Sequence, residues 1–237
     1  MNVYIAEVVG TALLITLGNG VVANVILHKT KGNNGGLIAI TFGWAIGVFV
    51  GVLTTANISG AHLNPAVSIG LAMIGKFDWA LVPGYLLAQL IGSMLGALMV
   101  WLIYRPHFDE TKDAATQLAV FSTAPSIRNA SQNFITEFLA TFIFMLTVLF
   151  ITKSTNSLGS LDALPVALVV LGIGLSLGGP TGYAINPVRD LGPRIMHSIL
   201  PIKGKGSSDW QYAWIPIIAP LGGAITAALL YQILVNS

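Results

Sequence analysis

Six long apolar segments recur along this chain, each close to the roughly 20 residues that a helix needs to cross a bilayer. They cover residues 4–27, 36–56, 79–104, 132–152, 161–178 and 211–234. Of the 237 residues, 54% are hydrophobic and only 8% are charged, whereas a soluble domain usually carries about 25% charged residues. A transmembrane β-barrel would show shorter, alternating segments. The sequence therefore predicts an all-α membrane protein with six transmembrane helices.

Two further apolar segments, at 64–74 and 186–198, are too short to span, and each begins with Asn-Pro. Asparagine is a strong helix N-cap, and proline is favoured in the first helical turn. Irregular backbone within a membrane is tolerated only where protein buries it or where it lines a water-filled cavity. We therefore expect two re-entrant half-helices beside a pore.

The second half of the sequence repeats the first. The run Ile-Ala-Glu-Val-Val-Gly-Thr at 5–11 matches Ile-Thr-Glu-Phe-Leu-Ala-Thr at 135–141. This match makes Glu7 and Glu137 equivalent, and the two Asn-Pro segments are equivalent in the same way. Each half carries three spans and one half-helix, and an odd number of spans inverts one half relative to the other across the membrane.

We expect a single transmembrane channel domain over residues 1–237. Its halves cover about 1–104 and 131–237, and a polar, turn-rich linker at 105–130 joins them. In inverted repeats with broken helices, the functional site lies near the middle of the membrane.

Composition and residue spacing argue against several other classes of protein. The chain has no cysteine, and no second histidine lies at metal-ligand spacing from His62, so we expect no metal and no other cofactor. The net charge of +2 gives no case for nucleic acid as a partner. No serine–histidine or two-metal arrangement is apparent, so we do not expect an enzyme.

The two Asn-Pro loops carry a specific resemblance. They read Ser-Gly-Ala-His-Leu-Asn-Pro-Ala-Val at 59–67 and Gly-Tyr-Ala-Ile-Asn-Pro-Val-Arg-Asp at 182–190. Both resemble the signature loops of the aquaporin (major intrinsic protein) family, and the likeness extends over essentially the whole chain. Asp190, directly after Arg189, is more similar to the glycerol-facilitator branch than to the water-selective branch.

This resemblance implies a function and a setting. The function is passive passage of glycerol, other small neutral solutes and water, with ions and protons excluded. The setting is the lipid of the plasma membrane, where the family forms homotetramers with one pore per subunit. Both termini would lie in the cytoplasm.

The central motif of the pore, by the same resemblance, consists of Asn64, Pro65, Ala66, Asn186, Pro187 and Val188. Each half-helix begins with unpaired backbone N–H groups and a partial positive charge of about half a unit. Two such ends facing each other disfavour cations and protons. The asparagines cap the helices and can offer amide N–H groups to a passing oxygen. Val188 stands where the family usually has alanine.

Two ladders of backbone carbonyls are expected to replace the hydration of a solute. The resemblance assigns them to Gly60, Ala61, His62, Leu63, Gly182, Tyr183, Ala184 and Ile185. Individual carbonyls could instead be paired within the protein.

The selectivity filter that the resemblance implies is formed by Trp44, Gly174, Tyr183 and Arg189. Two aromatic faces would form an apolar corner for a carbon backbone, with the arginine opposite to serve the hydroxyls. Gly174 stands where water-selective members tend to carry histidine, and Tyr183 where glycerol facilitators usually carry phenylalanine. An arginine in an apolar segment usually faces a cavity, although it could snorkel to the surface, and Trp44 could be an interfacial belt residue.

Three acidic residues are expected to support the re-entrant loops. By resemblance, Glu7 and Glu137 accept hydrogen bonds from these loops, and a buried carboxylate needs such donors. Their alternative role is a proton relay. Asp190 is expected to brace the loop of Arg189, or to be a first-turn charge without a wider role. His62 is expected to fix its loop.

Two rival functions and one conflict stay open at this point. The rivals are a water-selective pore and a proton-coupled secondary transporter that uses Glu7 or Glu137 as its proton carrier. The conflict concerns orientation, because positive charges normally favour the cytoplasmic side. The family orientation instead places only Lys76 and Lys153 inside, and it places outside Lys29, Lys31, Arg105, Lys112, Arg128, Lys203 and Lys205.

Overall fold

The computed structural model describes residues 1–151 and 159–236, and these residues form helices and connecting loops without a β-strand. The six expected spans appear as α1 (Val3–Ile26), α2 (Gly36–Ser59), α4 (Val82–Glu110), α6 (Ala130–Ile151), α7 (Leu164–Leu177) and α9 (Ile215–Asn236). The two half-helices are α3 (Pro65–Met73) and α8 (Pro187–Ile199). Three short helices complete the described ranges: η1 (Trp79–Leu81), α5 (Ala114–Ala119) and η2 (Gly159–Ala163).

Five helices in the described ranges are long and apolar enough to cross a membrane, namely α1, α2, α4 with η1, α6 and α9. The remaining expected span is a shorter apolar helix over Leu161–Leu177. The connection predicted from Lys153 to Ser160 falls largely on residues 152–158, outside the described residues. Apolar side chains cover much of the outer surface, as expected for contact with lipid.

The linker region differs from the prediction. The third span was expected to end at residue 104, but α4 continues through Pro106 to Glu110, and α5 follows within the supposed turn region. The side chain of Gln117 explains the order of this region, because its amide donates to the carbonyls of Phe108 and Thr111 at 3.1 and 2.8 Å. These contacts tie α5 to the end of α4, so the linker region at 105–130 contains helical segments as well as turns.

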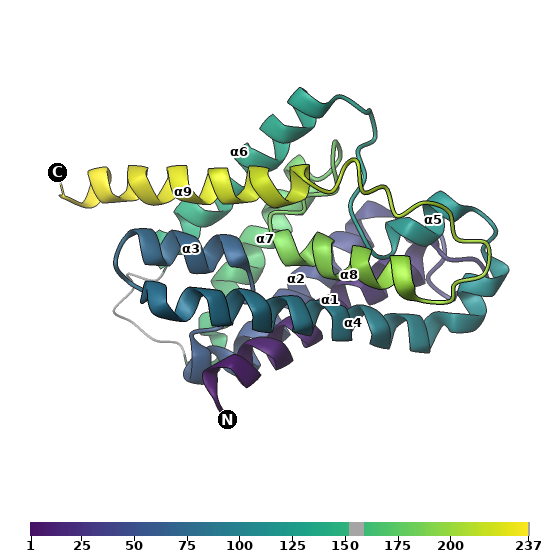
Figure 1. The fold of residues 1–237 in the computed structure, drawn as a ribbon, viewed down its shortest axis with the longest axis horizontal. Helices are drawn as coiled ribbons and strands as arrows, with labels where there is room; N and C mark the ends of the chain where they lie inside the picture. Colours follow the sequence, from purple (N-terminus) through teal and green to yellow (C-terminus); the bar gives the residue numbers. More distant parts are fainter. Residues whose placement is uncertain (152–158, 237) are drawn as a thin grey trace.

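The halves are packed alike. α1 contacts α2 and α4, and in the second half α6 contacts α7 and α9. Each half-helix also contacts a long helix of the other half, α3 against α9 and α8 against α4. Figure 1 shows α3 and α8 extending in opposite directions from the middle of the molecule. This exchange brings the starts of the two half-helices together at the centre.

Close contact between α1 and α2 depends on glycines of α2. A Cβ atom on Gly47 or Gly51 would lie 2.9 Å from the carbonyl oxygen of Leu14 or Gly10, respectively. Small residues let helix backbones approach each other in lipid, where packing replaces the hydrophobic effect as the source of association. This tight pair of α1 and α2 forms part of the wall of a cavity inside the molecule.

Candidate functional site

Both half-helices begin where the sequence predicts, at an asparagine cap followed by proline. The Asn64 side chain accepts a hydrogen bond from the backbone N–H of Ala66 at 2.9 Å, and the Asn186 side chain accepts one from Val188 at 3.1 Å. Both asparagines have extended backbone and are buried. The caps satisfy some of the N–H groups that a helix start leaves unpaired.

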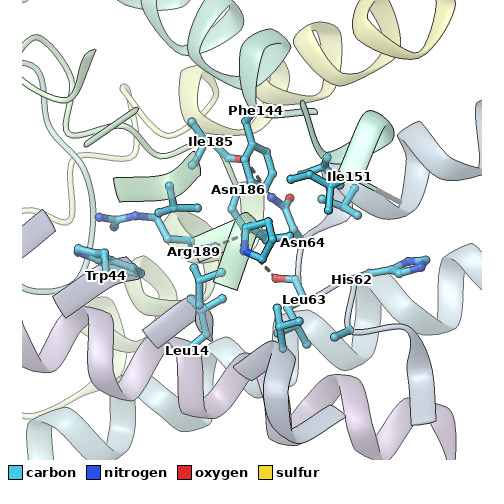
Figure 2. Close-up of a pocket in the computed structure, with 18 of the residues that line it drawn as sticks. Leu14, Trp44, His62, Leu63, Asn64, Phe144, Ile151, Ile185, Asn186 and Arg189 are labelled. Atoms are coloured by element: carbon cyan, nitrogen blue, oxygen red, sulfur yellow. Dashed lines mark hydrogen bonds between the residues drawn. The ribbon is translucent and has the colours of Figure 1, made fainter. Parts of the chain in front are cut away.

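The two asparagines also link the halves to each other (Figure 2). The amide of Asn64 donates to the carbonyl of Ile185 at 3.0 Å, and the amide of Asn186 donates to the carbonyl of Leu63 at 2.9 Å. Of the eight carbonyls expected to serve a solute, these two each accept one hydrogen bond within the protein, and a carbonyl oxygen has a second lone pair. A side-chain amide has two N–H donors, so each asparagine keeps a second one for another acceptor.

The extended loops before the prolines hold an unusual backbone conformation. Four non-glycine residues have positive φ angles, Ala61 (49°), Leu63 (53°), Tyr183 (38°) and Ile185 (44°). Such conformations are disfavoured for residues with a Cβ and cost on the order of 1–3 kcal/mol each. The pattern is the same in both loops, so both require external support.

Glu7 provides acceptors for the first loop. Its Oε1 accepts from the Ser59 hydroxyl at 2.6 Å and from the His62 backbone N–H at 3.0 Å. Its Oε2 accepts from the Leu63 backbone N–H and from the Gln89 side chain, both at 2.8 Å. The carboxylate is fully buried, and these four donors supply the partners that a buried carboxylate needs.

Glu137 has the equivalent place in the second half. Its Oε1 accepts from the Thr181 hydroxyl at 2.6 Å and from the Ala184 backbone N–H at 3.0 Å, and its Oε2 accepts from Ile185 at 3.1 Å. The donors come from the strained loop, as they do at Glu7. These are the contacts that the predicted loop-supporting role requires of both glutamates.

A cavity of about 450 Å³ lies beside the two asparagines. Apolar residues of four helices line part of its wall, among them Leu14, Val48, Val52, Phe144, Val148 and Val170. The two loops with Asn64 and Asn186, and Arg189, line it as well. The cavity thus combines hydrocarbon surface with hydrogen-bonding groups.

Arg189 faces this cavity, so it does not snorkel to the surface, and its guanidinium carbon lies 4.0 Å from the centroid of the Trp44 ring. Figure 2 shows the arginine directly beside the indole. The resemblance implies an arginine opposite the aromatic faces, whereas in the structure Arg189 lies over the face of Trp44. The physical reason is the attraction of a poorly solvated cation for the electron-rich face of an indole.

Tyr183 lines the cavity, whereas Gly174, within the described part of the structure, lies behind its ring. A Cβ on Gly174 would come within 2.9 Å of the phenol carbon Cζ of Tyr183 and 2.4 Å of a methyl carbon of Thr41. A Cβ on Gly178 would lie 2.5 Å from Cδ1 of the same ring. The structure therefore brings Trp44, Tyr183 and Arg189 together at the cavity, and Gly174 provides the space for the Tyr183 ring.

Arg194 is a buried residue that the sequence analysis missed. Its guanidinium donates to both carboxylate oxygens of Asp190 at 2.7 and 2.9 Å, and also to the backbone carbonyls of Thr123, Ser208 and Asp209. Asp190 in turn accepts from the backbone N–H and the hydroxyl of Thr123 at 2.8 and 2.7 Å. The pair ties α8 to the linker and to the loop before α9. The signal in the sequence that could have revealed this pair is the spacing of Asp190 and Arg194, two opposite charges four residues apart in an apolar helix.

His62 lines the cavity from the first loop. Its ring lies 3.0 Å from the Ser68 hydroxyl and packs against the rings of Phe77 and Tyr85. No group of three or more potential metal ligands occurs among the described residues. The contacts of His62 are those expected of a residue that fixes its loop.

Comparisons with known proteins agree with this geometry. The model of the family "Major intrinsic protein" matches residues 1–231. The chain is 53% identical over 232 residues to a probable glycerol uptake facilitator protein of Thermotoga maritima, with 98% of this chain and 99% of the relative covered. It is 47% identical to the glycerol uptake facilitator protein of Bacillus subtilis, with 98% and 84% covered.

A solved structure shows the same architecture. The X-ray structure of the aquaglyceroporin from Plasmodium falciparum matches with a TM-score of 0.88 and 34% sequence identity, and the match covers 98% of this chain and 95% of that one. It extends over both halves and both half-helices. With its paired Asn-Pro half-helices and its family match over nearly the full length, the chain belongs to the major intrinsic protein family.

Proposed function

We propose that this integral membrane protein is a passive channel for glycerol, other small neutral solutes and water. The glycerol facilitators among its relatives and the aquaglyceroporin structure support this function. The observation that carries it is the mixed lining of the 450 Å³ cavity, which offers both hydrocarbon surface and hydrogen-bonding groups. A linear polyol has a hydrocarbon side and a hydroxyl side, so both of its sides find matching surface there.

The constriction would select the solute through Trp44, Tyr183 and Arg189, with Gly174 setting the position of the tyrosine. The indole and phenol rings offer apolar surface to the carbon backbone of a polyol. The guanidinium lies against the indole and still has planar N–H donors for the hydroxyls. A histidine at position 174 would push the Tyr183 ring toward the opening, because the space is already filled.

The central motif would exclude ions. Asn64, Pro65, Ala66, Asn186, Pro187 and Val188 place two positive helix ends beside the solute path. A cation or proton meets this field, and Arg189 adds a full charge to it. A neutral solute instead receives an N–H group from each asparagine. Backbone carbonyls would serve it at Gly60, Ala61, His62, Leu63, Gly182, Tyr183, Ala184 and Ile185.

Stopped-flow light scattering of proteoliposomes tests the transport mode. Under an inward glycerol gradient, we expect fast reswelling that is the same with and without a pH gradient, because a passive pore does not couple to protons. Glycerol accumulation driven by the pH gradient would instead support the transporter, with Glu7 or Glu137 as carrier. Empty liposomes, and liposomes with Asn64→Asp Asn186→Asp protein of equal content, serve as controls.

We also propose a homotetramer in the plasma membrane with both termini in the cytoplasm, in line with the family. The chain has no cysteine, so single cysteines report orientation cleanly. In whole cells, a membrane-impermeant maleimide should label Lys112→Cys and should label Lys76→Cys only after lysis. The reverse pattern would overturn the orientation and would agree with the positive-inside rule.

A further inference from the structure

The indole of Trp44 rests against α1 at Gly18. A Cβ atom on Gly18 would lie 2.3 Å from the ring carbons Cε3 and Cζ3 and 2.6 Å from Cη2. Ordinary contacts of a Cβ are 3.4–4 Å. The indole therefore occupies the volume in which any residue other than glycine would carry its side chain.

Among the described residues, this ring is held by packing and not by a hydrogen bond. The Trp44 indole nitrogen is buried, and no hydrogen bond reaches it within the described residues. The guanidinium of Arg189 lies over the ring, with its carbon 4.0 Å from the ring centroid. Gly18 and Arg189 are thus two of the contacts that bound the position of the indole.

The ring separates Gly18 from the cavity. Trp44 lines the cavity, and in the described part of the chain Gly18 does not. A methyl group at position 18 would require the ring to move by about 1 Å to regain ordinary contact distances. The ring cannot move toward α1, because the new methyl group lies there, so it moves away from α1, toward the cavity and Arg189.

We propose that Gly18 is a positioning residue for solute selection: it sets how far the Trp44 indole reaches into the constriction. The proposal rests on the proposed function, because it takes Trp44 as one wall of the solute path. A ring that reaches further narrows the path for a polyol before it blocks water, since water has the smaller cross-section. Gly18 would therefore control the ratio of glycerol to water permeability.

Gly18→Ala tests the proposal, and Gly20→Ala is its matched control. A Cβ on Gly20 meets its nearest neighbour, a methyl carbon of Val100, at 4.0 Å, so this change adds the same group to the same helix without a clash. In proteoliposomes of equal protein content, we expect Gly18→Ala to lower the glycerol-to-water permeability ratio by at least about tenfold, which equals about 1.4 kcal/mol of added barrier. Gly20→Ala should leave the ratio unchanged.

A double-mutant cycle separates positioning from helix packing. Trp44→Leu removes all three ring atoms that Gly18 contacts, so Gly18→Ala in that background should change the ratio by less than about twofold. A general loss of packing between α1 and α2 would instead persist in the leucine background. The effect of Gly18→Ala on the permeability ratio therefore differs between the two backgrounds only if the indole transmits it.

Each outcome bears on the proposal. An unchanged ratio in Gly18→Ala, or an equal effect in both backgrounds, overturns it while the glycerol channel stands. A wild-type protein without glycerol flux defeats the proposed function instead. If Gly18→Ala cannot be reconstituted, recovery of folded protein in Gly18→Ala Trp44→Leu supports the proposal, and failure of both variants overturns it.

Discussion

The buried pair of Arg194 and Asp190 leads to a prediction about stability. The arginine makes five hydrogen bonds and both side chains are fully buried. Arg194→Met keeps much of the volume but leaves the Asp190 carboxylate buried, with Thr123 as its only remaining donor among the described residues. Breaking a buried pair in this way costs about 3–5 kcal/mol. For a chain of this length, that loss lowers the melting temperature by about 6–20 °C.

The measurement is the apparent Tm of purified protein in detergent at a fixed scan rate, because unfolding of such proteins is commonly irreversible. Arg105→Met is the control. Arg105 is exposed, and its guanidinium carbon lies 5.1 Å from the Trp101 ring, so its loss should cost less than about 1 kcal/mol.

A second variant tests the electrostatic reasoning itself. Arg194→Met Asp190→Leu removes both charges, so it should melt at a higher temperature than Arg194→Met alone. The reasoning is refuted if Arg194→Met melts with the control, or if the double variant is as unstable as the sum of both single changes.

Three further predictions follow from the loops and helix contacts. Glu7→Gln and Glu137→Gln each place an amide N–H against loop donors, so each should lower glycerol and water flux together, by about tenfold; loss of glycerol flux alone would contradict this. Gly51→Ala puts a methyl 2.9 Å from a backbone carbonyl of α1 and should lower the apparent Tm, whereas Gly172→Ala, whose Cβ meets nothing within 4 Å, should not. Hydrogen bonds from a threonine in the first turn of α5 hold the pKa of Asp113 below its usual value of 3.8. The ionised Asp113 side chain should therefore contribute fully to the protection of α5 amides from hydrogen exchange above pH 3.8. This protection should decline only as the pH falls through the lower pKa of the folded state. A decline in protection already near neutral pH would contradict this prediction.

The sequence predicts those features that depend on local signals. Apolar length locates the spans, and Asn-Pro locates both half-helix starts, because the cap and the first-turn proline act within a few residues. The equivalence of Glu7 and Glu137 follows from the repeat, and in the structure both accept hydrogen bonds from the loop backbone.

The features that the sequence analysis missed depend on contacts between distant segments. The stacking of Arg189 on Trp44 brings together a side chain of α2 and one from the start of α8, and no spacing in the sequence expresses that contact. The resemblance alone assigns Gly174 to the selectivity filter, and only the structure shows that the Tyr183 ring fills the space beside it. The end of α4, beyond residue 104, receives hydrogen bonds from the side chain of Gln117, which lies past the helix in the sequence.

The most direct test of the central claim is a comparison of glycerol and water permeability in the same proteoliposomes. After mixing with hyperosmotic glycerol, the wild-type protein should give fast shrinkage from water efflux and then fast reswelling from glycerol entry. Both phases should exceed those of empty liposomes, because the cavity offers a wall for hydrocarbon and a row of donors for hydroxyls. Fast shrinkage with reswelling no faster than in empty liposomes would contradict the account and would identify a water-selective pore.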